Sequence, residues 1–179
     1  MALGRYHSLM SSVVQPVLRL WPLAAACASA AMLAVAHAFE RFGGLSPCTL
    51  CYYQRDVYWA ALSAGMIGFA LMYLRQPWLG RAADVILALV FLAGAGIASY
   101  HAGAEWKWWP GPTTCSGGGT VDAAGLNALL NGAKFAAPRC DEAAWRMLGL
   151  SMAGWNVLVS LGLTGLSLAA AARTDRHDD

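Results

Sequence analysis

The chain has 179 residues, of which 58% are hydrophobic and only 12% are charged, and its mean hydropathy is +0.47. This composition is far more apolar than that of ordinary soluble domains, so it excludes most of them and indicates a membrane protein. The formal net charge is only +2, and we expect no nucleic-acid partner.

Four stretches of the sequence contain no Asp, Glu, Lys or Arg, and each is near or above the roughly 20 residues that a helix needs to cross a membrane. They lack the alternation of a transmembrane barrel, so helices are the expected form. We predict an all-α membrane protein, a four-transmembrane-helix bundle in a single domain over residues 1–179. The expected spans are approximately 20–39, 57–74, 85–104 and 147–172, with exposed loops over 40–56 and 105–146. Buried helices of a soluble protein are the alternative.

The first span also resembles a secretory signal, because Arg5 and Arg19 precede an apolar run that ends in Ala36-His37-Ala38. The run is long for a signal sequence, so we expect it to stay as a span. Cys27 lies alone inside it, and we expect this thiol to serve in packing and to be inert.

The second helix is preceded by a pair of cysteines in the sequence Ser-Pro-Cys-Thr-Leu-Cys-Tyr-Tyr-Gln-Arg, residues 46–55. Cys48 is expected near the helix N-cap, and Cys51 and Arg55 follow at helical spacing, so all three should share one face. A helix N-terminus and a guanidinium both favour thiolate over thiol, which predicts a reversible, redox-active disulfide. A zinc site or a purely structural disulfide are the alternatives for this motif.

The long third loop, 105–146, carries Cys115 and Cys140, so four of the five cysteines share one side of the membrane. Glycine-rich sequence around Cys115 predicts a movable tether. Leucines within 121–135 recur on one helical face, which predicts a short helix on the membrane surface or one packed on the spans.

The orientation follows from the loops, since Lys and Arg are balanced between the two sides. The short loop over 75–81 contains two arginines and no acid, which favours the cytoplasm. Paired thiols persist as disulfides on the oxidising side. We therefore expect loops 40–56 and 105–146 to face outward.

Three segments resemble a known family. Residues 40–55 are similar to the P-C-x-L-C-x-x-[QE]-R signature of the DsbB family, the disulfide bond formation proteins of the bacterial inner membrane. Residues 100–115 resemble the approach to its third cysteine, and residues 140–156 resemble its entry into the last helix. The resemblance extends over nearly all of the chain.

This resemblance implies an enzyme of the inner membrane whose redox loops face the periplasm. The enzyme would oxidise a soluble DsbA-like thiol oxidase and reduce a membrane quinone, either ubiquinone or menaquinone. It would use no metal. The resemblance also implies that Cys115 forms the mixed disulfide with the partner and that Cys140 is its disulfide mate. Cys48 would exchange with that pair. Cys51 would meet the quinone beside Arg55, which would polarise a quinone oxygen.

Some details stay open. His101, near the end of the third span, is a weaker candidate for the quinone site, with a solvated or structural histidine as the alternative. Glu105 and Trp106 lie in a similar position, and their contribution to the quinone site stays open. A vitamin K epoxide reductase-like protein would share four helices and a C-x-x-C motif, but there the motif lies late in the chain. A four-helix adaptor with structural disulfides, similar to a tetraspanin, is the alternative without enzyme activity.

Overall fold

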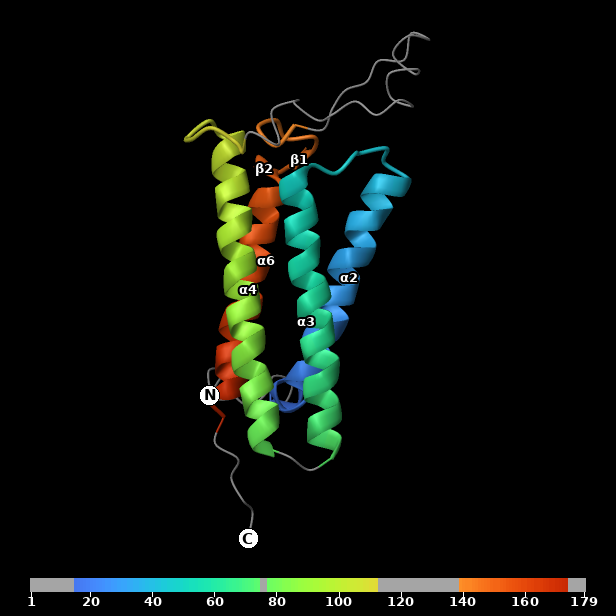
Figure 1. The fold of residues 1–179 in the computed structure, drawn as a ribbon, viewed down its shortest axis with the longest axis vertical. Coiled ribbons are helices and arrows are strands. Elements are labelled where there is room, and N and C mark those ends of the chain that lie inside the picture. The colour runs from blue at the N-terminus through green and yellow to red at the C-terminus, as the bar shows by residue number, and fades with distance from the viewer. Residues whose placement is uncertain (1–14, 75–76, 113–138, 174–179) are drawn as a thin grey trace, which may run out of the picture.

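The computed structural model describes residues 15–74, 77–112 and 139–173, so Cys115 and the surface helix expected within 121–135 lie outside the described residues. The described part contains four long helices, one small hairpin and a short helical stretch over residues 15–19 (Figure 1). The helices are α2 (Trp21–Arg41), α3 (Thr49–Tyr73), α4 (Pro77–Glu105) and α6 (Met152–Ala171), and the hairpin pairs β1 (Arg146–Met147) with β2 (Leu150–Ser151).

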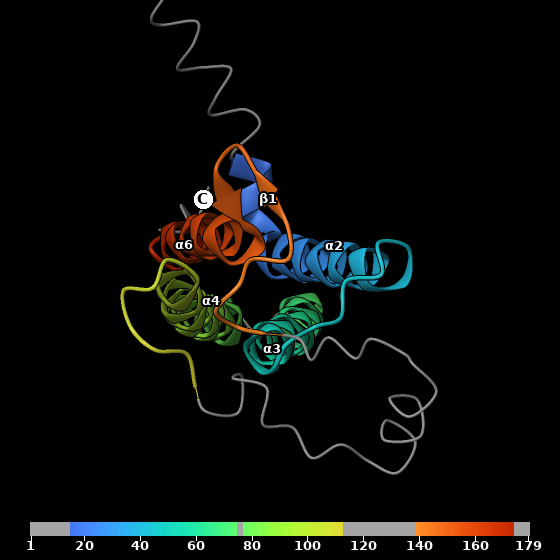
Figure 2. The same ribbon diagram turned by 90° about the horizontal axis from the view of Figure 1, so that it is seen from above.

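The four helices form a bundle in which α4 packs on both α3 and α6, while α2 packs mainly on α3 (Figure 2). At one end of the bundle lie the segment between α2 and α3, the end of α4 and the hairpin. The end of α3 and the start of α4 lie at the opposite end, with the start of α2 and the end of α6. The described parts of the loops expected on one side of the membrane therefore lie at one end of the bundle.

Three of these helices are long and apolar enough to cross a membrane, namely α2, the part of α4 over Trp78–Glu105, and α6. The 25-residue α3 is not among them, because its first turns carry polar and charged side chains and the rest includes glycine, serine, tyrosine and tryptophan. The chain is therefore a mostly helical membrane protein. The expected span over 57–74 lies on α3, and its crossing of the membrane stays a prediction.

Small residues let the helices approach closely. A Cβ atom on Gly65 of α3 would lie 2.6 Å from the carbonyl oxygen of Pro22 in α2, and one on Gly68 would lie 2.6 Å from the Cβ of Ala83 in α4. Interfaces between membrane helices commonly rely on such residues, since lipid supplies no hydrophobic force between helices. The fully buried Leu87 and Phe91 of α4 fill the centre of the bundle.

Polar contacts tie the helices together at the end away from the hairpin. The indole nitrogen of Trp21 in α2 donates to Ser167 Oγ in α6 at 2.9 Å. Asp84 of α4 is fully buried, and its Oδ2 lies 3.6 Å from Nη2 of Arg173, just beyond α6. A buried carboxylate is costly without a partner, so this ion pair fixes the end of α6 against α4.

The last helix begins later than the charge-free stretch does. Residues 146–151 form the hairpin, whose turn places Leu148 at φ 52° and Gly149 at φ 83°. Ser151 then caps α6, since its Oγ accepts a hydrogen bond from the backbone N–H of Gly154 at 3.1 Å. The stretch 147–172 therefore contains a hairpin as well as a helix, and the all-α expectation misses this small sheet.

Candidate functional site

The first turn of α3 presents the two cysteines of the 46–55 motif as free thiols. Cys48 is the N-cap, and its sulfur accepts from the backbone N–H of Cys51 at 3.4 Å. The two sulfur atoms lie 3.0 Å apart. The expected placement at a helix N-terminus is therefore what the structure has, and the pair is close enough to form a disulfide with little movement.

The hydrogen bond between the two thiols shifts their pKa values in opposite directions. A hydrogen bond from the Cys48 thiol lowers the pKa of Cys51 to about 7, against the opposing effect of burial. The same hydrogen bond, together with burial, raises the pKa of Cys48. Cys48 is only 4% exposed and Cys51 is more open, which also favours negative charge on Cys51. Cys51 is thus the more reactive thiolate of the reduced pair.

Arg55 points from α3 toward α2. Its Nη1 donates to Oε2 of Glu40 at 2.5 Å, and its Nη2 donates to the carbonyl oxygen of Ala36 at 3.2 Å. The side chain also lies over the ring of Tyr52, 5.6 Å from its centroid. Sequence reasoning identified Arg55 but missed its partner Glu40, although an acid shortly before a basic motif residue was an available signal.

Cys140 brings the third loop to the same place. The Cys48 sulfur, the Cys140 sulfur and a ring nitrogen of His101 all lie within 4.8 Å of one another, and all three residues are buried. Cys140 is in a disulfide. The structure thus brings Cys48, Cys140 and His101 together, whereas Cys115 lies outside the described residues.

Sulfur and imidazole ligands in such a group also resemble a metal site. A sulfur in a disulfide is not a thiolate ligand, however, which leaves Cys48 and His101 as the ligands of the group. A structural zinc site uses four ligands. The geometry therefore fits thiol–disulfide exchange between Cys140 and Cys48 better than it fits metal binding.

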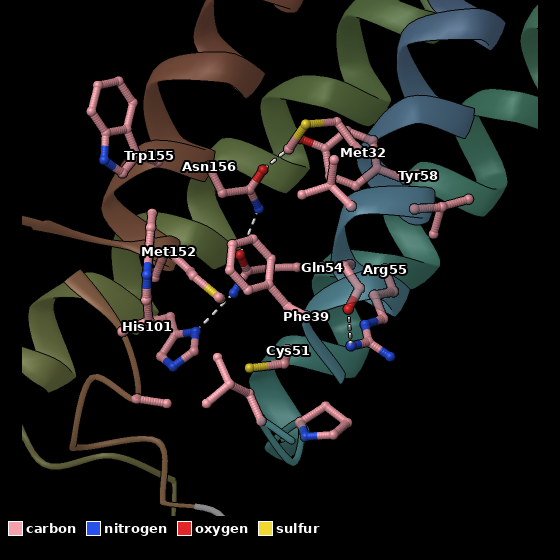
Figure 3. Close-up of a pocket in the computed structure, with 18 of the residues that line it drawn as sticks. Met32, Phe39, Cys51, Gln54, Arg55, Tyr58, His101, Met152, Trp155 and Asn156 are labelled. Atoms are coloured by element: carbon pink, nitrogen blue, oxygen red, sulfur yellow. Dashed lines mark hydrogen bonds between the residues drawn. The ribbon is translucent and has the colours of Figure 1, made fainter. Parts of the chain in front are cut away.

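A cavity of about 510 Å³ opens beside Cys51, between α2, α3 and the segment formed by the hairpin and α6. Figure 3 shows Cys51 and Arg55 of α3 and Phe39 of α2 around it. Most of its lining is apolar, with a few polar groups contributed by Cys51, Gln54, Arg55, Tyr58, His101 and Asn156. This size and chemistry are typical of a site for a small, largely apolar ring.

A buried chain of hydrogen bonds runs from the cavity to His101 (Figure 3). Tyr58 Oη donates to Asn156 Oδ1 at 2.5 Å, and Asn156 Nδ2 donates to Gln54 Oε1 at 2.5 Å. Gln54 Nε2 lies 2.8 Å from His101 Nδ1. Sequence reasoning named only His101 of this chain. Polar residues within or beside expected spans were the signal for the other three, because they rarely occur there without a role.

A charged cluster outside the spans holds the segment that carries Cys140. Lys107, at φ 62°, places its Nζ 2.8 Å from Oδ2 of Asp141, and Arg139 pairs with the same carboxylate at 3.0 Å. Hydrogen bonds from Arg139 and Lys107 hold the pKa of Asp141 well below its usual range. These contacts link the residue after Cys140 to the end of α4, close to His101.

Cys27 differs from the expectation that it packs inside the bundle. It is a free thiol on the exposed surface of α2, while Ala25, Ala26 and Ser29 form the buried face. It lies five residues, or somewhat more than one helical turn, before Met32, the first residue of α2 that lines the cavity. Its lack of a redox role stays a prediction.

Comparison with known proteins places these features in a family. A family model described as "DsbB: Disulfide bond formation protein DsbB" matches residues 18–170. Disulfide bond formation protein B of Dechloromonas aromatica is 28% identical over 153 residues, covering 81% of this chain and 87% of the relative. The protein of the same name from Marinobacter nauticus is 33% identical over 144 residues, covering 75% and 83%. That from Methylococcus capsulatus is 32% identical over 149 residues, covering 78% and 85%. No solved structure matches.

Proposed function

The chain belongs to the DsbB family and is a thiol oxidoreductase of disulfide bond formation, and from this premise we propose that it oxidises a periplasmic DsbA-like thiol oxidase and reduces a membrane quinone. The observation that carries the proposal is the pair of free thiols, Cys48 and Cys51, placed between buried Cys140 and a largely apolar cavity. One side of this pair faces a disulfide partner, and the other faces a site for a lipid-soluble acceptor.

Electrons enter at the third loop. A thiolate of the reduced partner attacks Cys115 in a disulfide with Cys140, and the partner's second thiolate completes its own disulfide. Two electrons and two protons leave the partner dithiol overall, and a quinone takes up the same number to become a quinol. The pairing of Cys115 with Cys140 is part of this proposal, and Cys140's participation in a disulfide supports it.

The transfer to α3 uses the short distance between Cys140 and Cys48. The Cys140 thiolate attacks the Cys48 sulfur of an oxidised Cys48–Cys51 pair, which forms a new disulfide and releases Cys51 with the bonding electron pair. The two sulfurs involved in the attack lie within 4.8 Å of each other in the structure. Cys51 leaves as a thiolate that a backbone hydrogen bond from Cys48 and the charge of Arg55 stabilise, and both remain when Cys48 is in a disulfide.

The cavity beside Cys51 fits a quinone ring, which would supply the final electron acceptor. Apolar side chains such as Met32 and Phe39 would hold the ring, and Arg55 would donate hydrogen bonds to a ring oxygen. A fixed guanidinium stabilises negative charge as it develops on that oxygen. Ubiquinone and menaquinone share this chemistry.

We further propose that the end of the bundle carrying the hairpin faces the periplasm of a bacterial inner membrane. The cysteine site lies at this end, where oxidising conditions allow disulfides to persist. The end of α3 and the start of α4, which contains Arg81, lie at the opposite end, as expected for the cytoplasmic side.

The test of the function uses the detergent-solubilised full chain, a reduced DsbA-like oxidase and a short-chain ubiquinone. Loss of quinone absorbance and oxidation of the partner thiols are followed together, and one quinone should be reduced for each dithiol oxidised. Cys51→Ala should abolish quinone reduction, whereas Cys27→Ala should keep the wild-type rate. A wild-type chain that leaves the quinone untouched, with inert disulfides, would instead support an adaptor.

A further inference from the structure

We propose that His101 acts directly on the thiol exchange, as the tautomer protonated at Nε2, by donating a hydrogen bond to the Cys48 thiolate. We further propose that Gln54, Asn156 and Tyr58 are positioning residues that hold this tautomer in place. The inference rests on the proposed function and assigns His101 to the sulfur chemistry rather than to the quinone.

The tautomer follows from the orientation of Gln54. Its Nε2 lies 3.3 Å from the backbone carbonyl oxygen of Leu50, which can only accept, so the amide nitrogen must lie on that side. The same nitrogen is 2.8 Å from His101 Nδ1 and donates to it. A neutral imidazole that accepts at Nδ1 carries its proton on Nε2.

The hydrogen bonds that lead from Tyr58 through Asn156 to Gln54 support the same orientation of the Gln54 amide. Gln54 Oε1 accepts from Asn156 Nδ2, and Asn156 Oδ1 accepts from the phenol of Tyr58 and, at 3.4 Å, from Ser160 Oγ. These residues come from α3 and α6 and are buried. A buried chain whose members are all paired is rigid, because rotating one amide would break the bonds on both of its sides.

The protonated nitrogen faces Cys48. His101 Nε2 lies 3.7 Å from Cys48 Sγ, within reach of a hydrogen bond to sulfur. Cys48 therefore accepts from His101 while its own thiol donates to Cys51 in the reduced pair. Because the imidazole keeps its other nitrogen occupied by Gln54, it can offer Nε2–H to this sulfur throughout the reaction.

Other charged and titratable groups surround the pair. Glu105, on the same helix as His101, places its Oε1 3.7 Å from His101 Nε2. A negative carboxylate at this place favours a proton on Nε2 but disfavours a thiolate on the neighbouring Cys48. Cys51, Arg55 and Tyr58 are the titratable groups of α3 near the site. Cys140 is in a disulfide and does not titrate, and Arg146 of β1 brings a positive charge near Glu105. Arg55 is engaged by Glu40, so His101 is the donor aimed at Cys48.

The hydrogen bond matters when Cys48 leaves a disulfide. In the proposed series of disulfide exchanges, the Cys115 thiolate then attacks Cys140 of the Cys48–Cys140 disulfide. A Cys115–Cys140 bond forms, and Cys48 leaves with the electron pair of the broken bond. The Nε2–H group stabilises that charge and keeps its proton, so no further acid, base or oxidant is required. A hydrogen bond to a charged group is worth about tenfold or more in an equilibrium.

The experiment measures the reactivity of Cys48 alone. In the full-length Cys51→Ala chain, alkylation of Cys48 by iodoacetamide is followed by peptide mass spectrometry between pH 6 and pH 10. Adding His101→Ala should slow alkylation about tenfold at pH 7 and leave the high-pH plateau unchanged. Gln54→Leu and Tyr58→Phe should slow it less, with the same plateau. Thr164→Val is the matched control, because its buried hydroxyl only donates to the Ser160 carbonyl of its own helix.

The alkylation rate at the high-pH plateau distinguishes a hydrogen-bonding role of His101 from a packing role. A variant that merely loosens the site would change the plateau as well, since access to a fully formed thiolate would change, and that result in His101→Ala would overturn the inference. An unchanged profile would overturn it too. The assay needs neither quinone nor partner, so a chain that shows the expected His101 dependence but reduces no quinone overturns the proposed function alone.

Discussion

Arg55 and Glu40 form an ion pair between α3 and α2, so the guanidinium reaches the cavity from a fixed position. Two of its nitrogens are used, one on Glu40 and one on the Ala36 carbonyl. Arg55→Lys keeps the charge but loses the planar guanidinium group whose two nitrogens make these contacts. We expect a quinone KM raised about tenfold, with oxidation of the partner thiols over a single turnover nearly unchanged. Steady-state quinone reduction and single-turnover thiol oxidation measure the two separately.

Glu40→Gln is the matched control for the arginine. It preserves the shape of the acid and the cation itself, and removes only the charge that orients Arg55. We expect a quinone KM between those of the wild type and Arg55→Lys. Wild-type constants in both variants would show that Arg55 only anchors α3 at the membrane surface.

Cys51 should titrate near neutrality in the reduced chain. Its pKa is lowered to about 7, chiefly by the hydrogen bond from Cys48, so the thiolate is mostly absent at pH 6 and mostly present at pH 8. Cys48→Ala removes the donor and should move the midpoint upward, which reduces the thiolate fraction at pH 7. Thiolate absorbance against pH measures the midpoint. A midpoint that stays near 7 in Cys48→Ala would assign the shift to the backbone hydrogen bond from residue 48 and to Arg55 instead.

Sequence reasoning found the parts of this site that depend on local helical spacing. Cys48, Cys51 and Arg55 lie within two turns of one helix, and a C-x-x-C motif after a proline already indicates that geometry. The contacts between Cys48, His101 and Cys140 join three distant segments, and no local pattern reports such distances.

The helices were equally predictable where the signal was local. Charge-free stretches located all four long helices, but Leu148 and Gly149 in left-handed conformation start a hairpin inside the last stretch. Hydropathy alone could not reveal that turn, because its residues are as apolar as the helix that follows.

Cys140→Ser should trap the relay at its first step. Without Cys140, Cys115 is a free thiol, so its thiolate can attack the disulfide of the oxidised partner, which forms the mixed disulfide and releases the partner's other thiolate. Non-reducing gels of the variant mixed with oxidised partner should show a covalent complex that disappears on adding reductant. Cys27→Ala should show none beyond the wild-type level, and turnover of quinone at the wild-type rate in Cys140→Ser would refute the relay.

Two glycine substitutions should have opposite effects on stability. An alanine at Gly65 would place its Cβ 2.6 Å from the backbone oxygen of Pro22, so α2 and α3 must separate, and we expect a loss of about 1–3 kcal/mol. An alanine at Gly96 meets nothing within 4 Å and should be neutral or stabilising by up to about 1 kcal/mol. Thermal unfolding in detergent compares them, and equal midpoints would contradict the close packing at Gly65.

The ion pair between Asp84 and Arg173 also bears on how the chain is made. Asp84, which directly precedes the expected span 85–104, is translated well before Arg173, its partner just beyond α6. A buried carboxylate without its partner is costly, so nascent α4 should remain beside the insertion machinery until α6 arrives. The two helices would then complete their insertion together, and a chain that terminates before Arg173 should be removed by membrane quality-control proteases rather than accumulate.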